Sequence, residues 1–234
     1  RETARIDRHM THRIITTKPA NKNHIAEYVD LYNGSFSNSR VFSQKYLEWL
    51  YGRKNFGIVG IDAWQNDRLV GQVAGIGSSF LLHGSIVNGL TAMNVCVSPA
   101  VRGKNLFARM CNDLCEYAHS QGFTMVVGVA NAAATTGWTK YAQFQLVAPL
   151  YVKVGIGNVF SGSSLDDSFD RCAFRRDWNG DDLDWRLNNP SANYFQSRVQ
   201  KRIFKAVKGR TGFKGITAIG YERGSTLPSQ KRLP

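Results

Sequence analysis

The sequence predicts an α/β fold in which helices flank a mixed central β-sheet, followed by a basic C-terminal extension. Three observations lead to this prediction. Short apolar runs alternate with turn residues between residues 56 and 154, one long amphipathic helix interrupts them, and the balance of charge changes sharply beyond residue 187. With 234 residues the chain is long enough to bury one good core, or one domain with an appendage.

The elements of the central region follow one another along the chain. We expect strands over residues 56–64, 68–82 and 86–97, a helix from residue 106, a strand over 124–130, a helical patch near 135–143 and a last strand over 144–154. The turns Gln65-Asn66-Asp67 and His83-Gly84 separate the first three strands. This order places three strands before the long helix and two after it.

Residues 94–121 are the most informative stretch of the chain. An apolar strand there runs into Ser98-Pro99, the turn Arg102-Gly103-Lys104-Asn105 follows, and a helix begins at once. Apolar residues recur along it with the spacing of a half-buried helix: Leu106, Phe107, Met110, Cys111, Leu114, Cys115 and Ala118. Backbone N–H groups beside the positive end of a helix dipole bind anions. Spacing alone leaves two interpretations open, a phosphate site and an ordinary strand-turn-helix.

The order of elements and the turn that opens the helix resemble the GNAT N-acyltransferases over residues 56–154. The phosphate motif of that family reads Gln/Arg-x-x-Gly-x-Gly/Ala. The matching residues here are Ala100, Val101, Arg102, Gly103, Lys104 and Asn105. Ala100 and Asn105 depart from the motif. Because Asn adopts left-handed dihedrals more readily than most side chains, the turn tolerates Asn105, and Arg102, Lys104 and backbone amides remain to hold the anion.

This resemblance implies acetyl-CoA or another acyl-CoA as the cosubstrate. Its pyrophosphate would lie on Arg102, Gly103, Lys104, Asn105, Leu106 and Phe107. The pantetheine arm would run between residues 93–97 and 124–130, which splay apart in this family, and the backbone of Val95 and Val97 would bind it. A neutral amine would attack the thioester directly, without a covalent enzyme intermediate. No His or Cys cluster has zinc spacing, so no metal site is predicted.

The proton carriers are harder to assign from the sequence. In many GNAT enzymes a Tyr in the helix after the fifth strand protonates the leaving thiolate, and the family spacing puts Thr139 at that place. Tyr141 lies two residues further on and is a second candidate. Asn131, at the end of the fifth strand, is placed to bond the pantetheine or the acceptor, although a helix-capping role fits it equally well. A base acting through ordered water would leave no sequence signature.

The charge of the chain is concentrated at its C-terminal end. Residues 187–234 carry ten Lys or Arg and one acid, a balance of +9 out of +13 for the chain, and seven acids precede them between Asp166 and Asp184. Within this end, Phe195, Val199, Ile203 and Val207 recur every fourth residue, which predicts a basic amphipathic helix. Its basic residues are Arg198, Lys201, Arg202, Lys205 and Lys208. Three interpretations remain open for it: a helix packed on the core, a membrane-surface helix and a nucleic-acid contact.

We expect the acceptor amine to be carried by a nucleic acid, either a DNA base or a tRNA-borne group, because uncompensated positive charge favours a polyanionic partner. The chain is similar in size and basicity to the phage Mom-type DNA-modifying acyltransferases. A second alternative rests on residues 46–55 and 182–195, which look like one another. They also resemble segments of bacterial GNAT proteins associated with surface-polysaccharide synthesis, which implies an amino-sugar nucleotide as the acceptor. A third is a GNAT-like binding module without activity.

The remaining features bound these hypotheses. We divide the chain into a possible tag or disordered N-terminus over residues 1–10, an acyl-CoA-binding domain over 11–160 and the C-terminal extension over 161–234. No apolar run is long enough to cross a bilayer, and we expect a cytoplasmic protein. The four cysteines (Cys96, Cys111, Cys115 and Cys172) fit core packing and a reducing compartment. The sequence does not predict an oligomeric state.

Overall fold

In a computed structural model, the protein is described over residues 14–36, 41–53, 56–103, 105–148, 173–178, 180–196, 202–208 and 214–221. Among these residues, six strands form a central sheet: β1 (Thr16–Pro19), β2 (Val59–Gln65), β3 (Arg68–Leu82), β4 (Ser85–Val97), β5 (Met125–Gly128) and β6 (Phe174–Arg176). The first five are neighbours in chain order, and β6 pairs with the far end of β3. Only the β4–β5 pair among them is parallel, so the mixed sheet that the sequence predicts is confirmed.

Two tight turns set the register of the first strands. Asn66 and Asp67 have φ values of 49° and 59° between β2 and β3, and His83 and Gly84 have φ values of 47° and 84° between β3 and β4. Two successive residues with positive φ match the twist of the flanking strands, which is why such loops close hairpins. The strands pair up to these loops, with Gln65 opposite Arg68. Both predicted turns are confirmed.

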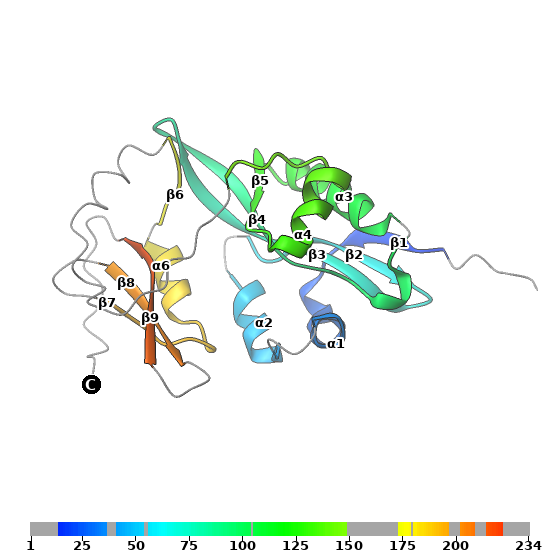
Figure 1. Ribbon diagram of the computed structural model, residues 1–234, viewed down its shortest axis with the longest axis horizontal. Coiled ribbons are helices and arrows are strands. Elements are labelled where there is room, and N and C mark those ends of the chain that lie inside the picture. The colour runs from blue at the N-terminus through cyan, green and yellow to red at the C-terminus, as the bar shows by residue number, and fades with distance from the viewer. Residues whose placement is uncertain are drawn as a thin grey trace, which may run out of the picture.

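The helices lie on both faces of the sheet (Figure 1). On one face are α1 (Ile25–Ser35), which follows the short turn η1 (Lys22–His24), and α2 (Gln44–Tyr51). On the other are α3 (Leu106–Ser120), which follows η2 (Pro99–Val101), and α4 (Ala132–Thr136), which continues into the π-helical turn η3 (Gly137–Tyr141). The sheet therefore has two cores, and we call the one under α1 and α2 the first core and the one under α3 the second core.

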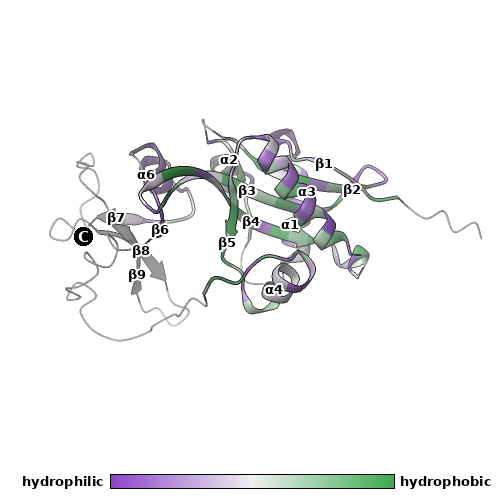
Figure 2. Cartoon of the chain, turned by 90° about the horizontal axis from the view of Figure 1, so that it is seen from above, coloured by the Kyte–Doolittle hydropathy of each residue, from purple (hydrophilic) through white to green (hydrophobic). Residues whose placement is uncertain are grey.

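The second core confirms the predicted stripe of α3. Six residues of this helix are buried: Leu106, Ala108, Met110, Cys111, Leu114 and Ala118. Figure 2 shows the resulting alternation of apolar and polar residues along α3, against the more apolar strands. Burial raises the pKa of the Cys111 thiol to about 12, and it does the same to Cys96 in the first core. Both thiols are therefore packing groups, because a thiolate is the reactive form.

The predicted basic helix in the C-terminal extension is wrong. This part of the chain contains the helix α6 (Gly180–Leu187) and an antiparallel sheet of β7 (Tyr194–Gln196), β8 (Arg202–Lys208) and β9 (Lys214–Tyr221). The four-residue repeat that includes Phe195 and Ile203 fits a helix. However, Ile203, Phe204 and Val207 are also strong strand formers. The pairing of β8 with β9 selects the strand. The boundary predicted after residue 160 and the possible tag over residues 1–10 lie outside the described residues.

The predicted strand over residues 144–154 is also wrong where the structure describes it. Residues 144–148 form no regular element, and residues 149–154 are not described. Gln143 has a φ of 58°, which turns the backbone away from an extended path. The ring of Phe144 then packs edge-on against Trp138, at 4.6 Å between centroids.

A pair of tryptophans joins α6 to α2. The indole rings of Trp49 and Trp185 are stacked, with centroids 4.7 Å apart and an interplanar angle of 4°. Each ring nitrogen donates to the backbone carbonyl of the other tryptophan, at 2.9 Å from Trp49 and 3.1 Å from Trp185. Arg53, just after α2, adds an ion pair with the buried carboxylate of Asp182 in α6. We call the two tryptophans the tryptophan clamp.

The tryptophan clamp should hold the C-terminal extension against the first core. We expect Trp185→Ala to lower the free energy of unfolding by about 3 kcal/mol, because it removes a large packed ring and the hydrogen bond that its ring nitrogen donates to Trp49. Trp178→Ala, which removes an equal ring outside the clamp, should cost about 1 kcal/mol or less. Chemical denaturation followed by circular dichroism measures both. Equal stability of Trp185→Ala and the unmutated protein would show that the clamp does not hold α6.

Candidate functional site

The two strands beside α3 separate part-way along their length. β4 pairs with β5 from Gly89↔Met125 to Ala92↔Gly128 and no further. β4 nevertheless continues for five residues to Val97, and no described strand pairs with that edge. The backbone groups of this stretch that point away from β3, apart from the Val97 carbonyl, which accepts from Arg102, are therefore available to a ligand that enters between the strands. The pairing between the two strands therefore ends before residues 93–97, and the pantetheine path between residues 93–97 and 124–130 stays a prediction.

A β-bulge marks the point at which the strands separate. Asn94 and Val95 together stand opposite Val73 of β3, and Asn94 has a φ of 49°. A bulge bends its strand and increases its twist locally, which turns β4 away from β5. Met93 packs against the first core, whereas Val95 and Val97 pack against the second. The side chains of the two predicted backbone ligands are thereby held under α3.

The turn between β4 and α3 has the features of an anion site. Gly103 has a φ of 79°, and an added Cβ there would meet no atom within 4 Å. Asn105 is left-handed (φ 55°) and precedes the helix without capping it by its side chain. The N–H groups of the first turn, from Leu106 and Phe107 on, point out of the helix without intrahelical acceptors. Arg102 lies beside them, and its Nε donates to the Val97 carbonyl at 3.1 Å.

The predicted tolerance of Asn105 for a left-handed conformation is confirmed by its φ. Lys104, also predicted to face the anion, lies outside the described residues. The opposite wall of this site is aromatic. Phe107 packs edge-on against Trp138 at 5.4 Å between centroids, and Gly137 lies so close to Phe107 that an added Cβ would be 3.1 Å from its ring. The start of α3 is therefore joined to η3.

The three candidates for proton transfer lie on α4 and η3. Asn131 caps α4, since its side chain accepts a hydrogen bond from the backbone of Ala134 at 2.8 Å. The Thr139 hydroxyl donates to the Thr135 carbonyl at 3.0 Å. Tyr141 is 56% exposed. Of the three, Tyr141 therefore presents the side chain that is least engaged with its own helix.

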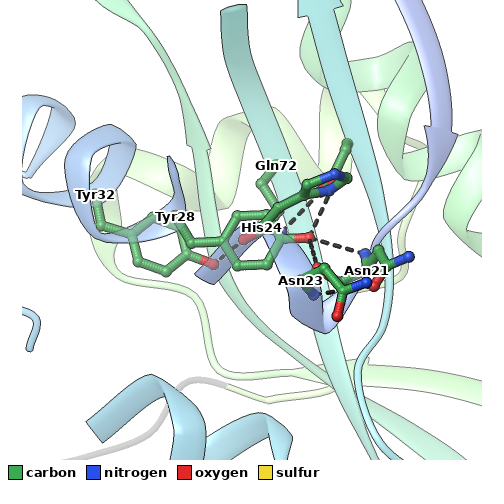
Figure 3. Close-up of polar contacts among 7 residues, drawn as sticks. Asn21, Asn23, His24, Tyr28, Tyr32 and Gln72 are labelled. Atoms are coloured by element: carbon green, nitrogen blue, oxygen red, sulfur yellow. Dashed lines mark hydrogen bonds and ion pairs between the residues drawn. The ribbon is translucent and has the colours of Figure 1, made fainter. Parts of the chain in front are cut away.

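Sequence reasoning missed a buried polar network on the α1 and α2 side of the sheet, and Figure 3 shows the part of it around His24, Tyr28, Tyr32 and Gln72. It contains Asp62 and Gln72 from the sheet, Tyr28 and Tyr32 from α1, Tyr51 from α2 and Asn94 from β4. All but Asn94 are buried. His24 lies at the outer end, with Nδ1 3.5 Å from the Asp62 carboxylate. One signal available in the sequence was the charged Asp62 within an otherwise apolar strand.

Burial sets the protonation of this network. It raises the pKa of Asp62 above its ordinary value of 3.8, although the hydrogen bonds from Gln72, Tyr28 and His24 act in the opposite direction. Burial also raises the pKa of the Tyr32 and Tyr51 phenols, so both stay protonated in the neutral range. Neither tyrosine is therefore suited to act as a base.

Three of the five basic residues predicted to bind nucleic acid lie on a different sheet from this site. Arg202, Lys205 and Lys208 belong to β8, in the separate three-stranded sheet. Arg198 and Lys201 lie outside the described residues. Within the described part of the chain, no group of three metal-ligating side chains is found. No helix of that part is long and apolar enough to span a bilayer.

Comparison with known proteins identifies this arrangement. Residues 16–142, more than half of the chain, match the family model described as an acetyltransferase (GNAT) domain. No curated protein matches the chain.

Among solved structures, a transcriptional regulator from Bacillus halodurans is similar with a TM-score of 0.50 and 14% identity, over 61% of this chain and all of that one. A predicted acetyltransferase from Clostridium acetobutylicum, solved with acetyl-CoA, has a TM-score of 0.48 and 18% identity, over 60% of this chain and 96% of that one. A Trypanosoma brucei acetyltransferase has a TM-score of 0.48 and 17% identity, over 60% of this chain and 100% of that one. At these identities the structural likeness concerns the fold.

Proposed function

This chain belongs to the GNAT acetyltransferase family, and from that premise we propose that it transfers an acyl group from acyl-CoA to an amine carried by a nucleic acid. The acyltransferase activity and the acyl-CoA cosubstrate follow from the family. We place the acyl-CoA site of this chain at the opening between β4 and β5, because that opening leads directly to the turn before α3. The acceptor is the part of the proposal that needs a separate argument.

The described residues fit acyl-CoA along the whole opening. Gly103 leaves open space where a side chain would stand, so a phosphate can approach the backbone at the positive end of α3. The free edge of β4 at Val95 and Val97 suits the amide groups of a pantetheine arm, which bind an extended backbone as a strand would. A β4 N–H at this edge would also polarise the thioester carbonyl.

The reaction then requires a neutral amine and two proton transfers. The amine nitrogen attacks the carbonyl carbon, the C–S bond breaks, and the thiolate leaves with the electron pair. The nitrogen loses one proton and the thiolate gains one, so the products are an amide and the free thiol. We assign the proton donor to Tyr141, because Thr139 already donates to the helix backbone. Asn131 would position α4 through its cap and the backbone beside the pantetheine.

The case for a nucleic acid rests on charge. Ten basic residues against one acid beyond residue 187 exceed what a small anionic acceptor would engage. β8 carries Arg202, Lys205 and Lys208 within seven residues, and β9 starts with Lys214. These basic residues therefore lie on two paired strands of one sheet, where a polyanion could contact several of them. An amino-sugar nucleotide, the alternative acceptor, carries too few phosphates to use this charge.

The cofactor site can be tested at Gly103. We expect Gly103→Asp to weaken acetyl-CoA binding by about 100-fold or more, because a carboxylate beside the pyrophosphate costs several kcal/mol. Gly84→Asp is the matched control, since Gly84 has nearly the same φ of 84° and equally open surroundings in the β3–β4 turn. Isothermal titration calorimetry on both folded variants measures the effect. Unchanged affinity in Gly103→Asp would remove the pyrophosphate from this turn.

The acceptor can be tested by the salt dependence of nucleic-acid binding. Replacing Arg202, Lys205 and Lys208 by Gln should reduce the slope of log K against log salt by about 0.9 for each lost duplex phosphate contact. The acetyl-CoA affinity should stay the same. A triple variant of the exposed residues Lys22, Lys45 and Arg68 removes the same charge from the other end of the chain and should leave the slope nearly unchanged.

The probes are duplex DNA, single-stranded DNA and tRNA, with binding followed by fluorescence anisotropy at several salt concentrations. If none of them binds the unmutated protein at low salt, the nucleic-acid acceptor is excluded and the amino-sugar nucleotide takes its place. If acetyl-CoA binds but no acceptor is modified, the chain is a binding module.

A further inference from the structure

The buried polar network ends at the point where β4 leaves β5. Starting from Asp62, Oδ1 accepts a hydrogen bond from Gln72 Nε2 at 2.7 Å. The oxygen of Gln72 is bonded to the Tyr32 hydroxyl, which lies 2.7 Å from the Tyr51 hydroxyl. Tyr51 in turn lies 2.9 Å from Nδ2 of Asn94. Five side chains therefore connect a buried carboxylate with the bulge of β4.

The carboxylate fixes the direction of every bond in this chain. Gln72 donates its amide N–H to Asp62 Oδ1, so it turns its oxygen to Tyr32. Tyr32 has one proton, which it gives to that oxygen, and it must therefore accept from Tyr51. Tyr51 donates its only hydroxyl proton to Tyr32, so it must accept a hydrogen bond from Asn94. Because Asn94 donates through its amide nitrogen, its Oδ1 is turned away from Tyr51.

The position of Asn94 makes that oxygen relevant to the reaction. The residue is only half-buried, and within the described part of the chain its Oδ1 accepts no hydrogen bond. It lies two residues beyond Ala92, the last residue of β4 that pairs with β5. Val95 and Val97 pack towards α3, whereas the Asn94 side chain reaches Tyr51 on the α1 and α2 side. The oxygen thus lies on the face opposite α3.

We propose that Asn94 Oδ1 accepts a hydrogen bond from the acceptor amine and so orients its nitrogen towards the thioester, and that Tyr51, Tyr32, Gln72 and Asp62 position Asn94 for this task. The inference rests on the proposed function, because it needs acyl-CoA in the β4–β5 opening. An amine has two N–H groups. When the C–N bond forms and the C–S bond breaks, one N–H proton is lost and replaces the acyl group on sulfur. The other hydrogen remains on nitrogen, and this N–H donates to Oδ1 in the product amide.

The network is built for positioning rather than for proton transfer. A relay needs a group that both accepts and releases a proton at each step, and the neutral amide of Gln72 interrupts the chain. The other interpretation is that the network only holds α1 and α2 on the sheet. A variant of Tyr51 separates the two roles, since its effect on stability and its effect on the acceptor nitrogen are measured independently.

The test uses two stable analogues, so it does not depend on the identity of the acceptor. In the first, CoA sulfur carries an N-methylacetamide group (CH2–CO–NH–CH3), which keeps one N–H where the product amide has it. In the second, an N,N-dimethylacetamide group lacks that N–H. The unmutated protein should bind the first about 10-fold more tightly than the second, as one hydrogen bond predicts.

The variants then assign this preference to Asn94. Asn94→Gly keeps a residue that favours positive φ and removes the side chain. The ratio of the affinities for the two analogues should therefore fall to about one, while CoA itself binds as before. Tyr51→Phe should reduce the preference to a few-fold, because Asn94 loses its orienting partner. Tyr28→Phe removes a hydroxyl from the same network beyond Gln72, at Asp62, and should retain the full preference.

Each outcome decides the matter. No preference in the unmutated protein, or an undiminished preference in Asn94→Gly, would overturn the proposal. A loss of preference in Tyr28→Phe equal to that in Tyr51→Phe would show a general structural effect and overturn the positioning role. If Asn94→Gly fails to fold, Tyr51→Phe carries the test. Failure of the unmutated protein to bind CoA at all would refute the placement of acyl-CoA in this chain, which is a different result from equal binding of the two analogues.

Discussion

The early end of the β4–β5 pairing is the constraint on which the rest of the site depends. Because the two strands part after Ala92 and Gly128, β4 runs on with one unpaired edge towards the turn that precedes α3. A bulge at Asn94, whose φ is positive, lies just beyond the end of this pairing and bends β4 there. A straight, fully paired β4 would leave no room for a pantetheine arm and would place the start of α3 elsewhere.

Buried polar groups connect the sheet with that bulge through a series of hydrogen bonds. Asp62 and Gln72 are fully buried in the sheet, and an unpaired polar group there would cost about 1–3 kcal/mol. Their hydrogen bonds to each other and to tyrosines of α1 satisfy them, and the same chain reaches the side chain of Asn94. α1 and α2 therefore do more than cover the first core, since they connect to the point where the strands part.

How much could be predicted from the sequence depended on how local the interactions are. The turns at Asn66-Asp67 and His83-Gly84 and the stripe of α3 follow from neighbouring residues, and they were predicted. The network joins residues 34 and 40 positions apart, so no local pattern reveals it. The wrong helix around Ile203 has a related cause, because pairing with the next strand prevails there over a four-residue repeat. Asn94 carried one local signal, because Asn is disfavoured within strands.

The most direct test of this account is to map acetyl-CoA on the protein by backbone amide NMR. The account predicts that the amide signals of Val95, Val97, Gly103, Leu106 and Phe107 move on addition of acetyl-CoA, whereas those of β8 and β9 stay in place. These amides line the open edge of β4 and the start of α3, which are the only described features that the proposal assigns to the cosubstrate. Saturable binding that leaves these five signals unchanged would contradict it.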